Sequence, residues 1–168
     1  MKSNIFYKLL IIIAIFTFFV ASITYAKEQI INLKSNIQNG EQGEVLIVSA
    51  RYDVSDKDNT LSGIALRIHY NSSSIEFLGV EKCLEKGVIS QKPILLTDTK
   101  NVDNDSTTDK MLQASWASLD GNWPDVVLDT LLFNMKFKII KKGGIIKTTV
   151  FEKAAGYNVD LKNAVITY

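Results

Sequence analysis

The segment LSGIALRIHYNSSSIEFLGV, residues 61–80, decides the fold class because it alternates, turns and alternates again. In its first half, every second residue is apolar and these residues share one face of a strand: Ile64, Leu66, Ile68 and Tyr70. Four polar residues, 71–74, then favour a turn, and an apolar pattern resumes at residue 75. The segment therefore predicts two half-buried strands joined as a β-hairpin or as a sandwich corner.

The first 26 residues have the layout of an export signal. Lys2 and Lys8 precede an uninterrupted apolar run over residues 9–16, and a cleavage position follows Ala26. We expect a helical signal peptide at residues 1–26 and a secreted domain, extracellular or periplasmic, at residues 27–168. The alternative is an uncleaved membrane anchor, because the extended apolar run approaches the length of about 17 residues that a spanning helix needs.

The length and charge of the remaining chain fit one ordinary domain. Removing 26 of 168 residues leaves 142, which is enough for a self-sufficient core. Without the two leader lysines, 17 basic residues face 18 acidic residues, so no nucleic-acid partner is expected. Cys83 is the only cysteine, and we expect it to be a small buried residue; a free thiol for an intermolecular bond is the alternative.

The rest of the chain alternates in short segments that are separated by turn-forming residues. Residues 44–54, 111–118 and 131–140 each carry an apolar face, and the last is the strongest single strand. An acid-rich and Asn-rich tract at residues 97–110 indicates a long exposed loop. About nine short strands, with no helical periodicity after the leader, predict an all-β, two-sheet sandwich with jelly-roll topology.

Four blocks of sequence follow one another in the order found in a known family. They are GEVLIVSARY at residues 43–52, YNSSSIEFLGV at 70–80, LLFNMKFKI at 131–139 and AAGYNVD at 154–160. In this order they resemble cohesin domains, the secreted modules that hold dockerins in cellulosomes. The resemblance implies a nine-stranded jelly-roll sandwich, related to carbohydrate-binding modules, with a non-catalytic role in extracellular assembly linked to polysaccharide use.

The resemblance also implies where a dockerin-like protein partner would bind. Cohesins that bind dockerins typically place an Asn and an Asp on the exposed face of the strand that ends in the tyrosine. Gly63 and Ala65 occupy those positions in this chain. The polar side chains that remain on this face and its neighbour, and that we expect to contact the partner, are Arg67, His69, Gln113 and Ser115.

Direct binding of a polysaccharide is the alternative function. Flat aromatic side chains supply large contact areas, and an exposed ring could stack on a sugar. Trp123 lies in the turn DGNWPD and is the candidate for such exposure. Trp116 shares an apolar face with Leu112 and Ala114, so we expect it to lie in the core.

No motif in the sequence indicates catalysis or a cofactor. His69 is the only histidine, and neither GxSxG nor HExxH accompanies it. We therefore expect a solvated histidine on a strand face and a protein that is not an enzyme.

The acidic loops do not follow the EF-hand pattern for calcium. Leu61 and Thr108 stand where that pattern requires glycine after the pairs at residues 56/58 and 103/105. We expect an ordinary solvated loop and no metal. A calcium site of another type is the alternative, with ligands from Asp98, Asp103, Asp105 or Asp109.

Overall fold

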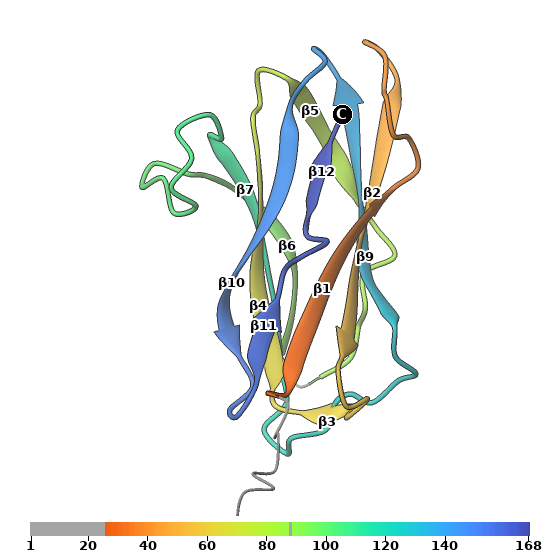
Figure 1. Ribbon diagram of the computed structural model, residues 1–168, viewed down its shortest axis with the longest axis vertical. Coiled ribbons are helices and arrows are strands. Elements are labelled where there is room, and N and C mark those ends of the chain that lie inside the picture. The colour runs from red at the N-terminus through yellow and green to blue at the C-terminus, as the bar shows by residue number, and fades with distance from the viewer. Residues whose placement is uncertain (1–25, 88) are drawn as a thin grey trace, which may run out of the picture.

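Alternating apolar residues build two packed β-sheets in the computed structural model, which describes residues 26–87 and 89–168 (Figure 1). The predicted signal peptide, except for its last residue Ala26, lies outside the described residues. Within the described ranges, no helix is long and apolar enough to cross a membrane.

The first sheet contains five strands and the second contains five more. In spatial order, the first sheet consists of β11 (Asn158–Asp160), β1 (Glu28–Ser35), β2 (Val45–Val54), β9 (Thr130–Ile139) and β5 (Ile75–Glu81). The second consists of β12 (Val165–Thr167), β10 (Ile145–Lys153), β4 (Gly63–Tyr70), β7 (Lys110–Ala117) and β6 (Ile89–Thr97). A short ribbon of β3 (Thr60–Leu61) and β8 (Trp123–Pro124) lies at one end.

The all-β, two-sheet sandwich predicted from the sequence is confirmed. The described residues form twelve strands rather than about nine, because β3, β8 and β11, with only two or three residues each, were too short to show a periodic pattern. Apart from the parallel β1–β11 pair, the paired strands are antiparallel.

The segment 61–80 forms a sandwich corner and not a hairpin. β4 belongs to the second sheet and β5 to the first, so the chain crosses the core between them. The turn is held by Ser73, whose backbone N–H donates to Asn71 Oδ1 at 2.8 Å. Tyr70 of β4 and Phe137 of β9 meet across the core with ring centroids 5.2 Å apart. The apolar faces of β4 and of β5 therefore point into the core between the two sheets.

Both tryptophans lie in the core. Trp116 is buried as predicted, and its indole N–H donates to the Leu84 carbonyl at 2.9 Å. The prediction that Trp123 is exposed is wrong: it is 0% exposed, with its ring 4.7 Å from that of Tyr52 and 6.0 Å from that of Trp116. The reason is that the loop after β7 turns inward and pairs Trp123 with Leu61, which places the indole over the end of the core.

Candidate functional site

The strand register gathers the four predicted contact residues on one face. Ser115 pairs with Ala65, and Gln113 pairs with Arg67, across β7 and β4. Because the apolar residues between them point into the core, these side chains lie on the outer face of the second sheet. His69, two residues after Arg67 on β4, belongs to the same face.

Arg67 is held in place on this face by two neighbours. Its Nε donates to Gln113 Oε1 at 3.1 Å, and its guanidinium carbon lies 4.0 Å from the centroid of the Phe151 ring. Phe151 is 37% exposed, and Ile94, which pairs with Gln113 from β6, is 38% exposed. We call the surface made by Arg67, Gln113, Ser115, Phe151 and Ile94 the outer patch.

Phe151 is a member of the outer patch that the sequence did not indicate. The pairing of β10 with β4 shifts register between Val150 and Glu152, and Phe151 is the extra residue in this irregularity. A β-bulge of this kind redirects a side chain, and the local sequence carries no clear signal for it. Only the cross-strand contact with Arg67 shows that the ring lies on the outer face.

A loop covers the end of the outer face next to the patch. This covering loop, residues 98–109, is closed by a hydrogen bond from the Asp98 backbone N–H to the Asp109 carbonyl at 2.9 Å. It is tied to the sheet by Lys147 of β10, whose Nζ lies 2.9 Å from Asp105 Oδ2. Beneath the loop, His69 is 0% exposed, so the prediction of a solvated histidine is wrong.

The surroundings of His69 are polar although its side chain is buried. Its Nε2 lies 2.8 Å from Thr149 Oγ1, while its Nδ1 lies 3.3 Å from Asp98 Oδ2 and 3.7 Å from Asp103 Oδ2. Burial lowers the pKa of the imidazole, and this effect outweighs the opposite effect of the two carboxylates. The uncharged form of the ring is therefore favoured.

The contacts between Asp103 of the covering loop and Lys147 of the sheet favour the charged forms of both groups. Burial opposes the charged form of Asp103, but hydrogen bonds from Thr108 and Lys147 outweigh it, so the pKa of this carboxyl lies below its usual value. For Lys147, burial works against the charged ammonium, and its bonds to Asp105 and Asp103 outweigh burial and raise its pKa. The loop is thus attached to the sheet by fixed charges.

A hollow of about 280 Å³ lies between the outer patch and the covering loop. Arg67 and Met111 of the sheet line one side, and Asp98, Lys100 and Val102 of the loop line the other. The hollow extends the outer patch and combines apolar and charged groups.

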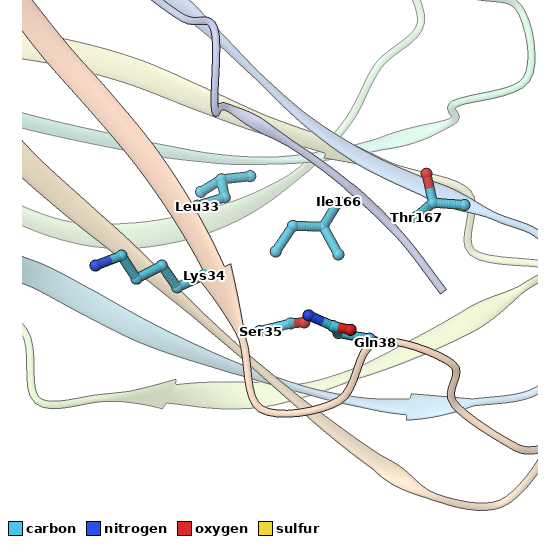
Figure 2. A pocket seen from close by; sticks show the side chains of 6 residues that line it. All are labelled: Leu33, Lys34, Ser35, Gln38, Ile166 and Thr167. Atoms are coloured by element: carbon cyan, nitrogen blue, oxygen red, sulfur yellow. The ribbon is translucent and has the colours of Figure 1, made fainter.

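Another hollow, of about 430 Å³, lies between β1 and β12 (Figure 2). Its lining residues are Leu33, Lys34, Ser35, Gln38, Ile166 and Thr167. This lining contains no carboxylate, imidazole or thiol, so it offers no acid–base pair or activated nucleophile. We assign no function to it.

Cys83 lies beside a third hollow, near Phe77 and Pro93. It is partly buried rather than fully buried, and burial raises the pKa of its thiol. A raised pKa reduces the thiolate fraction at neutral pH, which disfavours a reactive role. An intermolecular bond through Cys83 stays the untested alternative.

Comparison with solved structures shows which fold this sandwich has. The solution structure of CaCohA2 from Clostridium acetobutylicum superimposes with a TM-score of 0.51 and 18% sequence identity, covering 83% of this chain and 90% of that chain. The fold is cohesin-like. The resemblance stated from the sequence is thus confirmed at the level of the fold.

Two cohesins from Acetivibrio cellulolyticus match the chain with lower TM-scores. A type II cohesin domain from the cellulosome of Acetivibrio cellulolyticus has a TM-score of 0.47 and 18% identity, covering 83% of this chain and 95% of that chain. The sixth cohesin of scaffoldin B from the same organism, solved in complex with a variant of the Cel5 dockerin, has a TM-score of 0.47 and 13% identity over 77% and 94%. No protein-family model and no curated protein sequence matches the chain.

Proposed function

We propose that this cohesin-like chain is an exported, non-catalytic module that binds a dockerin-like protein through the outer patch. The role would be extracellular assembly linked to polysaccharide use. The observation that carries the proposal is the arrangement of Arg67, fixed between Gln113 and Phe151, next to the exposed Ile94. Arginine and aromatic residues are enriched in protein interfaces and often dominate their binding energy.

The fixed position of Arg67 supports a binding role. A guanidinium that is already stacked on a ring and hydrogen-bonded loses little side-chain entropy when a partner arrives. Among the described residues, Arg67 takes part in no ion pair, so no carboxylate of these residues compensates its charge. The matching partner surface carries a carboxylate beside apolar side chains.

Direct binding of a polysaccharide has less support. Trp123, the ring expected to stack on a sugar, is fully buried between Tyr52 and Trp116. The exposed aromatic residue of the outer patch, Phe151, has its ring in contact with Arg67. The structure therefore favours a protein partner.

Substitution of Arg67 by glutamate should weaken the complex at least about tenfold, which corresponds to about 1.4 kcal/mol. The change reverses the charge and removes the contact with the Phe151 ring. Calorimetric titration with purified dockerins from the organism that encodes this chain measures the effect. The matched control is Lys138→Glu, which makes the same charge change at an exposed position of β9 in the other sheet. Equal weakening by both variants, or no dockerin binding to the unmodified protein, would contradict the proposal.

Export is a separate part of the proposal. Cleavage after Ala26 would leave Lys27 as the first residue of the mature protein. We expect N-terminal sequencing of material recovered outside the producing cell to begin at Lys27. Recovery of the chain only in the membrane fraction, with residues 1–26 retained, would support the membrane anchor instead.

A further inference from the structure

One buried nitrogen beneath the covering loop faces two carboxylates without a hydrogen bond. His69 Nδ1 makes no hydrogen bond to the described residues, although Asp98 Oδ2 and Asp103 Oδ2 lie 3.3 Å and 3.7 Å away. All three side chains are 0% exposed. When Nε2–H donates to Thr149 Oγ1, which lies 2.8 Å away, the lone pair of Nδ1 points toward the carboxylates. The Nδ1 lone pair and the two carboxylate oxygens then face one another in a buried site.

The cluster also lacks positive charge. In the described part of the chain, the carboxylates of Asp98, Asp103 and Asp105 are matched by the single ammonium of Lys147, which lies 3.0 Å from Asp103 and 2.9 Å from Asp105. Among the described residues, no Lys or Arg forms an ion pair with Asp98, whose side chain is 0% exposed. Buried acidic groups are usually paired or coordinate a metal. One divalent cation would supply the missing positive charge.

The two separations from Nδ1 are close to those in a site for a small cation with tetrahedral coordination. Metal–ligand distances of about 2.0–2.2 Å place neighbouring ligand atoms of a tetrahedral zinc site about 3.3–3.6 Å apart. The measured separations from Nδ1 are 3.3 Å and 3.7 Å, and all three ligand atoms lie within 4.8 Å of one another. An imidazole with two carboxylates suits Zn²⁺ and similar transition metals, whereas Ca²⁺ and Mg²⁺ prefer oxygen ligands alone.

We propose that His69 Nδ1, Asp98 and Asp103 form a binding site for one divalent transition-metal cation of the Zn²⁺ class. The site joins β4 to the covering loop, so a bound cation would attach the loop to the sheet beside the outer patch. Each ligand is already oriented by a hydrogen-bonding neighbour. Thr149 Oγ1 lies beside His69 Nε2, and the Val102 backbone N–H donates to both carboxylate oxygens of Asp98. Thr108 Oγ1 donates to Asp103 Oδ2.

Calorimetric titration of untagged, chelator-treated protein with ZnCl₂ tests the proposal. We expect one equivalent to bind with saturation, and an excess of CaCl₂ or MgCl₂ should not displace it. His69 is the only histidine, so the imidazole nitrogen signals of ¹⁵N-labelled protein report on this site alone. Zinc should shift the Nδ1 signal strongly and leave Nε2 nearly unchanged.

Two variants connect the binding to the named ligands. Asp98→Asn keeps the side-chain shape and should lower the zinc affinity at least about tenfold, with a folded state confirmed by near-ultraviolet circular dichroism. Asp109→Asn is the matched control, because Asp109 bonds Ser72 at the exposed base of the loop and is not a proposed ligand. Absence of saturable binding, an unchanged Nδ1 signal, or equal affinity of Asp98→Asn and unmodified protein would each overturn the proposal.

Discussion

Replacing Trp123 by alanine should lower the free energy of unfolding by about 3–5 kcal/mol, the usual loss for a large aromatic residue in a core. The indole is 0% exposed and packs against the rings of Tyr52 and Trp116. Its removal would leave a cavity at the end of the sandwich, next to the short pairing of β3 with β8. Equilibrium unfolding in urea measures the loss.

The control for this variant is Val127→Ala, at a position that is 88% exposed in the loop before β9. We expect that change to stay within about 0.5 kcal/mol. A loss below about 1 kcal/mol for Trp123→Ala would contradict the buried position of the ring. Retention of the unmodified protein on polysaccharide gels, abolished in a Trp123→Ala variant that stays folded, would instead restore the sugar-binding alternative.

The second large effect is expected at Gly63, where β4 begins. Its φ of +130° lies in a region that other residues rarely adopt, and an added Cβ would lie only 2.0 Å from the Trp116 carbonyl oxygen. Backbone strain and overpacking cost about 1–3 kcal/mol each. Gly63→Ala should therefore lose more than about 2 kcal/mol of unfolding free energy, because the contact is with backbone that cannot rotate away.

Gly79→Ala separates the two causes of this loss. Gly79 has a similar φ of +147°, but nothing lies within 4 Å of its added Cβ. This variant should show the backbone strain alone and be the less destabilised of the two in the same urea experiment. Equal losses of unfolding free energy in the two variants would show that the close approach of Gly63 to the Trp116 carbonyl does not add to the destabilisation.

Gly63 also explains one departure from the cohesin pattern. Cohesins that bind dockerins typically carry an Asn at this position, but in this chain the close Trp116 carbonyl leaves no room for a side chain. The Gly63 carbonyl is in turn used by Gln29, whose buried amide donates to it at 3.1 Å. The glycine therefore serves packing.

The amino-acid sequence by itself determined the all-β sandwich and much of its core, including the burial of Trp116. The physical reason is that side chains alternate between the two faces of any strand, so a local pattern records which face is apolar. The same alternation put Arg67 and Gln113 on one outer face before their pairing was known. These conclusions need only neighbouring residues.

Only the tertiary structure decided where the irregular segments lie. Trp123 is buried by a short pairing with Leu61, Phe151 reaches the outer patch through a bulge, and His69 is covered by a loop. Each outcome depends on contacts between distant parts of the chain, such as the one between His69 and Thr149, which are 80 residues apart. A local sequence pattern cannot encode such contacts, because their energy exists only after both sheets have packed and the loops have closed over them.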